Sequence, residues 1–267
     1  SIASGGNYNT VVGDEAGTAI TTGDQNTGIG FEALQDTTTG GNNTSVGSIS
    51  LSANTTGTNN VAVGQAALTV STTGTFNTAV GKSAGEQVTT GTFNTLIGGL
   101  AGDAITTSSN NTAVGYSALT TNTTGDGRAF GAYALFSNTT GSNNTALGAT
   151  ALYANTTGIS NLAAGLASLR YNTTGGYNVA LGVNALNANT TASNNTAVGY
   201  ASLGANTTGT NNTAVGYFAL KGNTTGAENV AVGRQALEVN TTATGNNAFG
   251  SRALGSNTTG ASNIAVG

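Results

Sequence analysis

The sequence predicts an all-β fold, a parallel β-solenoid or β-roll of about fifteen seventeen-residue rungs. The first observation is a row of glycines that recur at a constant seventeen-residue spacing from Gly13 to Gly267, with one interval, Gly115 to Gly131, that is one residue shorter. The second is the alternation of side-chain types before each repeat glycine, which is typical of a strand. A unit this short cannot bury a core alone, so neighbouring copies must stack.

Each repeat has restricted and variable positions, counted from the residue after the repeat glycine. Position 3 is Ala or Ser in every copy, and position 4 is Leu in twelve of the fifteen copies. Positions 1, 2, 5, 6, 11 and 12 vary freely and carry nearly all of the charged and aromatic residues. We therefore expect these six positions to face the solvent.

Residues 212–216, Asn-Thr-Ala-Val-Gly, represent the segment that we expect to form a strand in each copy. The Val and the residue two before it point to one side of a strand, whereas the Ala and the Gly point to the other. We expect the Val side to fill the core. The Ala and Gly side is small enough for a second backbone to come very close.

The Asn-Thr-Thr-Gly segment at positions 7 to 10 has the residues of a turn. Asn and Gly tolerate unusual backbone dihedrals, and Thr hydroxyls can bond to the backbone. Stacked Asn residues can also hydrogen-bond to one another between rungs.

Positions 4 and 7 vary together, which locates the interior. Three copies have Gly in place of Leu at position 4, and the same three copies alone have an apolar residue at position 7. We expect the side chains of the two positions to occupy the same part of the core. The apolar volume lost at position 4 is then replaced by apolar volume at position 7. The residues concerned are Gly17 with Ile20, Gly85 with Val88, and Gly102 with Ile105.

Each rung can bury only a little apolar surface, which stabilises the fold. Ordering its residues costs conformational entropy on the order of 1 kcal/mol or more per residue, which opposes folding. Three chains that share their Ala and Gly faces would bury more, so we expect a homotrimer. The pattern indicates a single repeat array over residues 1–267, with a register irregularity at residues 116–131. We interpret the chain as a fragment of a longer fibre protein.

Composition argues against several functions. The charged fraction is 6% and the net charge is −4, so we expect no nucleic-acid partner. No stretch approaches the roughly 20 apolar residues of a membrane span, so we expect no membrane insertion. The chain has no His and no Cys, and its ten acidic residues do not recur at one position. We predict no catalytic residue, no cofactor and no metal site.

Aromatic residues crowd the middle of the chain around the short repeat, which contains Gly127 and Arg128. A residue deleted there is expected to bend or widen the roll locally. Exposed aromatic rings could grip sugars or a partner, although single exposed rings need no function. The candidate surface-contact residues are Tyr116, Tyr133, Phe136, Tyr153, Tyr171 and Tyr177.

The paired Thr rows at positions 8 and 9 allow two interpretations. One outward Thr per rung would make a flat array of hydroxyl and methyl groups, as on the surface of an ice-binding β-solenoid with a Thr ladder. The other interpretation, which we favour, is that the hydroxyls close the turn by bonding to the backbone. An enzymatic reading, a polysaccharide-degrading fibre, would need two acidic residues that meet across a groove.

The recurring stretch Asn-Thr-Ala-Val-Gly-x-x-Ala-Leu resembles the Asn-Ser-Val-Ala-Ile-Gly-x-x-Ala units in the heads of trimeric autotransporter adhesins. The fuller pattern of residues 195–209 resembles the repeats of bacterial and phage tail-fibre-domain proteins, which commonly precede a self-cleaving chaperone domain. The resemblance covers the whole chain and implies a left-handed parallel β-roll that is three chains wide. The chain departs from the adhesin pattern because its units are longer, and we place the extra residues in the Thr-Thr-Gly turn.

These observations favour a structural or adhesive segment of an extracellular fibre without catalysis. The fibre would be a phage tail fibre on the virion or an adhesin on the bacterial cell surface. The segment would serve as a spacer or would contact a cell-surface glycan or protein receptor. A chain without oxidisable sulfur suits this extracellular setting.

Overall fold

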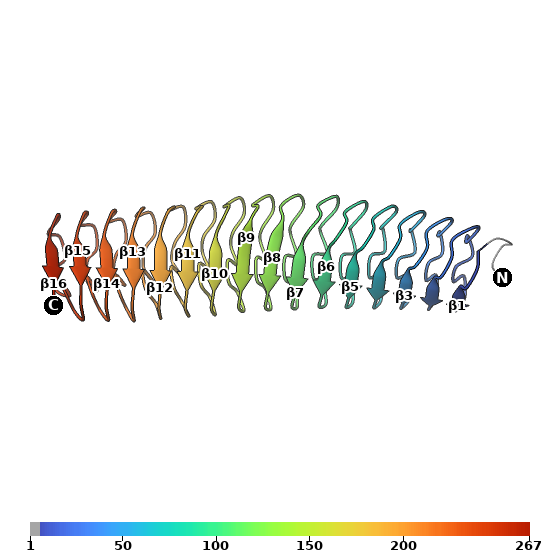
Figure 1. The fold of residues 1–267 in the computed structure, drawn as a ribbon, viewed down its shortest axis with the longest axis horizontal. Coiled ribbons are helices and arrows are strands. Elements are labelled where there is room, and N and C mark those ends of the chain that lie inside the picture. Colours follow the sequence, from blue (N-terminus) through green and yellow to red (C-terminus); the bar gives the residue numbers. More distant parts are fainter. Residues whose placement is uncertain (1–5) are drawn as a thin grey trace. The chain divides into compact units, whose positions relative to one another are not determined.

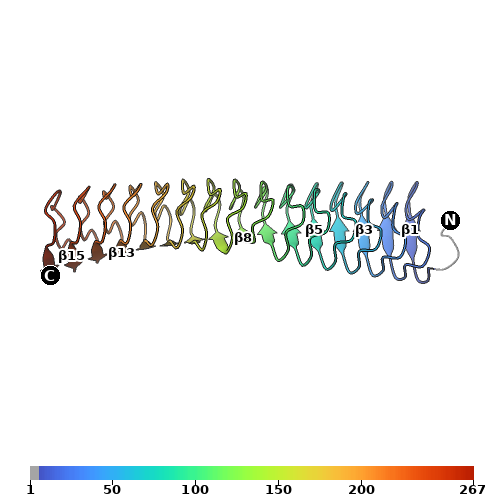
Figure 2. The same ribbon diagram turned by 90° about the horizontal axis from the view of Figure 1, so that it is seen from above.

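The computed structural model describes residues 6–267, and in these residues it is all-β, with sixteen strands and no helix. The chain divides into two compact units, Ser1–Ala132 (unit 1) and Tyr133–Gly267 (unit 2). Within each unit, successive rungs stack so that their strands lie side by side (Figure 1). The second view shows the same one-strand-per-rung stacking within each unit (Figure 2). The predicted parallel β-solenoid is therefore confirmed.

Unit 1 contains eight strands that pair in parallel and in sequence order. Partners across the ladder are one full repeat apart, as in Val61 opposite Thr78. Its strands are β1 Thr10–Val12, β2 Thr27–Ile29, β3 Thr44–Val46, β4 Val61–Val63, β5 Thr78–Val80, β6 Thr95–Ile97, β7 Thr112–Val114 and β8 Gly127–Phe130.

Unit 2 repeats the arrangement with eight more parallel strands in sequence order. Its register is again one full repeat, as in Thr196 opposite Thr213. The strands are β9 Asn144–Leu147, β10 Leu162–Ala164, β11 Val179–Leu181, β12 Thr196–Val198, β13 Thr213–Val215, β14 Val230–Val232, β15 Asn247–Phe249 and β16 Ile264–Val266.

The short repeat keeps the strand register. Thr112 of β7 lies opposite Arg128 of β8, one residue fewer along the chain than elsewhere. Gly127 stands where the other copies have Asn at position 13, and its backbone N–H donates to Asn111 Oδ1 at 2.9 Å. The deletion is thus absorbed in the turn before β8.

The strands turn the opposite side inward from the one predicted. Ala62 and Ala79 at position 15 are fully buried, whereas Ile97 at position 16 is 39% exposed. The physical reason is the narrow interior, which also holds the Leu of position 4 and the Asn of positions 7 and 13. A methyl group fits in the space that remains, and the branched side chains of positions 14 and 16 are left outside.

The second backbone that approaches the repeat glycines is the next rung of the same chain. A Cβ added to Gly64 would lie 2.5 Å from the carbonyl oxygen of Gly81, and Gly64 has a φ of +131°. Because the Ala row is interior and the Gly row contacts the same chain, neither can form the three-chain contact that the sequence predicted. The prediction that chains meet through the Ala and Gly rows was wrong. A trimer would have to form through another surface of the chain.

The coupling of positions 4 and 7 is confirmed. A Cβ added to Gly102 would lie 2.8 Å from Ile105 Cδ1, and the same Cβ would lie 2.7 Å from Leu96 Cδ2. Leu96 also occupies the space beside Gly85, where an added Cβ would lie 2.6 Å from its Cδ1. Leu96 is fully buried at position 15, so this one side chain replaces the missing Leu of two neighbouring rungs.

Two rows of buried asparagines link the rungs, as predicted. In the row at position 13, Asn60 Nδ2 donates to Asn43 Oδ1 at 3.1 Å and to the carbonyl of Gly74 at 2.8 Å. In the row at position 7, Asn155 Nδ2 donates to Asn138 Oδ1 at 2.8 Å. Buried amides are costly without partners, so these ladders hold successive rungs in one register.

The turn dihedrals lie elsewhere than predicted. Positive φ values occur at positions 2, 4 and 12, for example at Ala66, Leu68 and Phe76, and not at the Asn and Gly of the Asn-Thr-Thr-Gly segment. Leu68 has a φ of 52°, which is strained for a non-glycine residue. The complete burial of its side chain offsets that strain.

The first Thr of each pair closes the turn. Thr55 Oγ1 donates to the backbone carbonyl of Thr72 on the next rung at 3.1 Å, and Thr156 Oγ1 does the same to Thr173 in unit 2. The second Thr, such as Thr56, is exposed. The turn-closure interpretation is therefore confirmed for the row at position 8.

Candidate functional site

Three of the predicted contact residues form one aromatic cluster in unit 2. The rings of Phe136 and Tyr153 stack with centroids 5.1 Å apart and an interplanar angle of 5°. Tyr133 packs edge-on against both, at 5.7 Å from Phe136 and 6.5 Å from Tyr153. Phe136 and Tyr153 occupy position 5 of neighbouring rungs, so the rung stacking itself brings them together.

A cation extends this cluster to a fourth predicted residue. The guanidinium carbon of Arg170 lies 5.9 Å from the Tyr153 centroid and 5.2 Å from the Tyr171 centroid. These are cation–π distances. The aromatic cluster of unit 2 therefore consists of Tyr133, Phe136, Tyr153, Arg170 and Tyr171, and Tyr171 is 48% exposed.

The other two candidates stand at other positions of the repeat. Tyr177 is exposed at position 12, between the Thr-Thr turn and the next strand. Tyr116 is exposed at position 1 in unit 1, where its ring lies close to Gly99 of the preceding rung. Within unit 2, four of the six predicted residues come together.

A second aromatic group lies in unit 2 and was missed from the sequence. Tyr200 and Tyr217 stack at 5.5 Å, and Phe218 lies 4.1 Å from Tyr217. Lys221 Nζ lies 4.1 Å from the centroid of the Phe218 ring. The signal was present, because Tyr200 and Tyr217 stand at position 1 of adjacent copies. Both residues stand several copies after the short repeat, so they were not among the predicted contact residues.

In each unit, a row of outward side chains covers the sheet. It consists of positions 14 and 16 of every strand, which are Thr or an aliphatic residue in most copies, and we call it the sheet face. Its larger members are about two-fifths exposed, as with Ile29 at 41% in unit 1 and Leu147 at 41% in unit 2. Contiguous exposed apolar surface of this kind marks an interaction site.

Two carboxylates meet at position 5 of neighbouring rungs in unit 1. Burial and, second, the charge of Glu86 raise the pKa of Asp103 above its ordinary value. Asp103 Oδ1 is buried without a hydrogen-bond partner. Both rungs have Gly at position 4. The arrangement is a local destabilisation.

We expect Asp103→Asn to stabilise unit 1 at neutral pH. Because the folded pKa is raised, the native state binds more protons than the unfolded state between the ordinary pKa and the raised one. The stability of the wild type therefore falls as pH rises through that window. Thermal unfolding from pH 4 to pH 8 should show the advantage of the variant at high pH and its loss below the window. Asp36→Asn, an exposed change of equal charge, is the control, and an equal gain there would contradict the explanation.

In the part of the chain that the structure describes, no group of three or more acidic residues could hold a metal ion. Among the same residues, there is no helix long and apolar enough to cross a membrane. No protein-family model matches the chain, and no curated protein matches it. The resemblance to adhesin heads and tail-fibre-domain repeats stays a prediction from sequence.

Proposed function

We propose that the chain is a structural or adhesive segment of an extracellular fibre, either a phage tail fibre or a bacterial surface adhesin, and that it does no catalysis. The observation that carries the proposal is the rung itself. In both units its polar interior is used to link one rung to the next, through asparagine ladders and Thr-to-backbone bonds. Most of the variable residues lie outside, where they can change without disturbing the stack. Position 2 is buried in some copies, as at Ala66 and Ser117.

We further propose that the fibre is a homotrimer whose chains meet through the sheet face. The Ala and Gly rows are internal to one chain, so the contact must lie on another surface. The sheet face is partly exposed and has an aliphatic residue at position 16 in most copies, and it runs the length of each unit's sheet. Packing three such faces together would remove apolar surface from water, which drives association.

The experiment is sedimentation equilibrium on the chain, combined with electron microscopy of the particles. We expect three times the chain mass and fibrous particles. Val63→Lys with Val80→Lys, two charges on the sheet face, should shift the mass toward one chain. Thr56→Lys with Thr73→Lys, on the exposed Thr row, should not shift it. A wild type that is monomeric at all concentrations, or globular particles, would overturn the proposal.

Ice binding remains a second candidate, because the sheet face of unit 1 carries its own Thr row. Position 14 is Thr in six of its eight strands, and these Thr side chains point outward beside Val or Ile. The row at position 8, by contrast, is committed to the turn. A thermal hysteresis measurement separates the two functions, since a spacer or adhesive segment should show none.

A further inference from the structure

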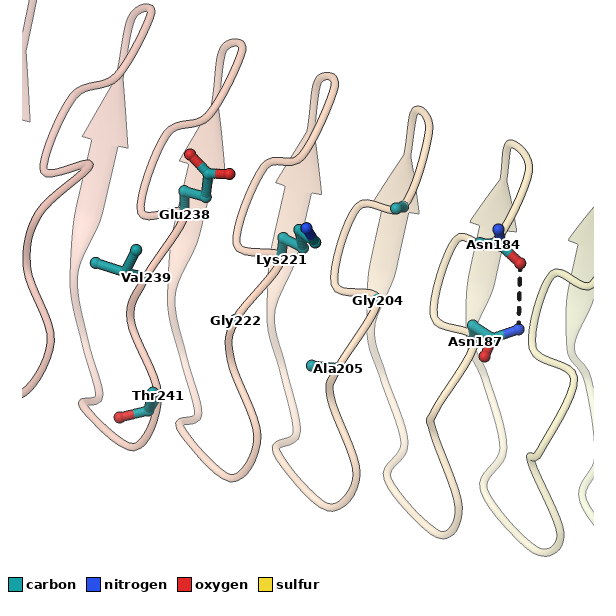
Figure 3. A pocket seen from close by; sticks show the side chains of 10 residues that line it. Asn184, Asn187, Gly204, Ala205, Lys221, Gly222, Glu238, Val239 and Thr241 are labelled. Carbon is teal, nitrogen blue, oxygen red and sulfur yellow. Dashed lines mark hydrogen bonds between the residues drawn. The ribbon is translucent and has the colours of Figure 1, made fainter.

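A groove lies on unit 2 at the corner formed by positions 5 and 6, and it begins on the rung that follows Tyr171. Its volume is about 670 Å³, and it crosses four successive rungs. Small residues, Gly204, Ala205 and Gly222, line its middle. Figure 3 shows Asn184 and Asn187 at one end, on the rung before Gly204, and Glu238 toward the other end, on the rung after Lys221.

The groove exists because one rung has only Gly204 and Ala205 at this corner, and the next rung has Gly222 at position 6. Elsewhere in unit 2, position 5 carries Phe136, Tyr153 and Arg170, which fill the corresponding surface. Here Gly204 at position 5 and the small residues at position 6 leave it open. The groove is therefore formed by small residues at positions where other copies of the repeat have large ones.

Polar side chains of several kinds converge on the groove. Lys221 brings an ammonium group and Glu238 a carboxylate, and Gln235 Nε2 donates to Glu238 Oε2 at 2.7 Å. Asn187 Nδ2 donates to the Ala167 carbonyl at 2.8 Å and lies 3.4 Å from Asn184 Oδ1. Asn187 Oδ1 and Asn184 Nδ2 take no part in these bonds, so the pair still offers one acceptor and one donor group.

Two backbone N–H groups that line the groove are already used. Ala205 N–H donates to the Lys221 carbonyl at 3.1 Å, and Gly222 N–H donates to the Glu238 carbonyl at 2.8 Å. A ligand cannot pair with these two donors, so we assign recognition at this groove to its side chains.

An aromatic surface borders the same groove. Lys221, which lines it, also lies over the ring of Phe218, and Phe218 packs against Tyr200 and Tyr217. Sugar rings have apolar C–H faces that pack on aromatic rings and hydroxyl rims that pair with amides, carboxylates and ammonium groups. The single positive and single negative charge balance, so the groove has no preference for a polyanion.

We propose that this groove binds a neutral, hydroxyl-rich oligosaccharide. Lys221 and Asn184 donate to its oxygens, and Glu238 and Asn187 accept from its hydroxyls. The proposal names a ligand class for the adhesive role proposed above, and it rests on that role. It assigns the contact to the same corner as the aromatic cluster of Tyr133, Phe136, Tyr153, Arg170 and Tyr171, but to the rungs that follow the cluster.

The test is titration of the full chain with linear oligosaccharides, followed by calorimetry and by NMR of the Asn side-chain amides. The probes are a neutral gluco-oligosaccharide, a chito-oligosaccharide and an acidic galacturonate oligomer. We expect binding of a neutral probe, weakened about tenfold by Lys221→Ala and abolished by Ala205→Tyr. Position 6 already holds Tyr171 in another copy, so the Tyr substitution fills the groove without a fold penalty.

Matched controls are Lys82→Ala and Ala104→Tyr, the same changes on exposed or half-exposed positions of unit 1. Both should bind the neutral probe as the wild type does. Binding of the acidic oligomer alone, binding of no probe, or equal binding by Ala205→Tyr would overturn the groove proposal. The sedimentation mass of the same samples reports on the fibre proposal separately, so a correct trimer without sugar binding rejects only the groove.

Discussion

Gly64→Ala is expected to destabilise unit 1 by about 3–5 kcal/mol. The φ of Gly64 is +131°, a conformation that residues with a side chain rarely adopt. An added Cβ would also lie 2.5 Å from the carbonyl oxygen and 2.6 Å from the carbonyl carbon of Gly81. Backbone atoms cannot rotate away as a side chain can, so two rungs would have to separate.

Urea unfolding measures the loss for Gly64→Ala, and hydrogen exchange locates it at the amides around β4 and β5. Gly99→Ala is the matched control, because its added Cβ would meet only the ring of Tyr116, at 3.5 Å and beyond, and a backbone oxygen at 3.9 Å. We expect the control to change stability by less than about 1 kcal/mol. An unfolding midpoint for Gly64→Ala that equals that of Gly99→Ala would refute the role given to the repeat glycines.

Leu96→Ala is the second change with a large expected effect, again about 3–5 kcal/mol. Leu96 is fully buried and fills the space beside both Gly85 and Gly102. Neither of these rungs has a Leu at position 4 that could move into the cavity. The substitution should therefore cost more than a typical truncation in a core that can collapse.

The neighbouring residue offers a control on the same strand. Ile97 points to the sheet face and is 39% exposed, so Ile97→Ala should cost clearly less than Leu96→Ala in urea unfolding. Equal losses for the two variants would show that β6 does not turn Leu96 inward. The comparison also tests the corrected facing of the strands directly.

The repeat length, the parallel register, most of the variable outward positions and the coupling of Gly102 with Ile105 could be predicted from the sequence. Position 2 is the exception, because Ala66 and Ser117 there are buried. Each of these predictions depends on comparison between copies within one chain, and fifteen copies supply enough comparisons. The Thr-to-backbone bond of Thr55 could be predicted as well, because hydroxyls in a tight turn have few other partners.

The facing of the strands could not be predicted in the same way. Alternation shows that Ala62 and Val63 lie on opposite sides, but it does not show which side is the interior. Size is a misleading guide here, because Leu68 and the asparagines already fill the narrow rung. Leu68 has a left-handed backbone, although the residues typical of a turn stand in the Asn-Thr-Thr-Gly segment. The bend at Leu68 could therefore not be predicted from residue types.

The groove and the second aromatic group were missed for a related reason. Gly204 and Lys221 occupy variable positions, and variability at one position says nothing about which neighbours it will meet. Lys221 lies over Phe218 of its own rung, but only the stacking of rungs brings it beside the gap at Gly204. Surface function in such a chain is decided between copies, along the stack, and less within any one of them.

The constant register from rung to rung has an evolutionary consequence. Recombination between copies that gains or loses one whole copy would join equivalent residues, since most rungs offer the same glycine, asparagine and threonine contacts to the next. Such events change the number of rungs without creating a new kind of contact between neighbouring rungs. A shift of a single residue is tolerated only in a turn, and the join between Thr112 and Arg128 preserves the trace of one such event.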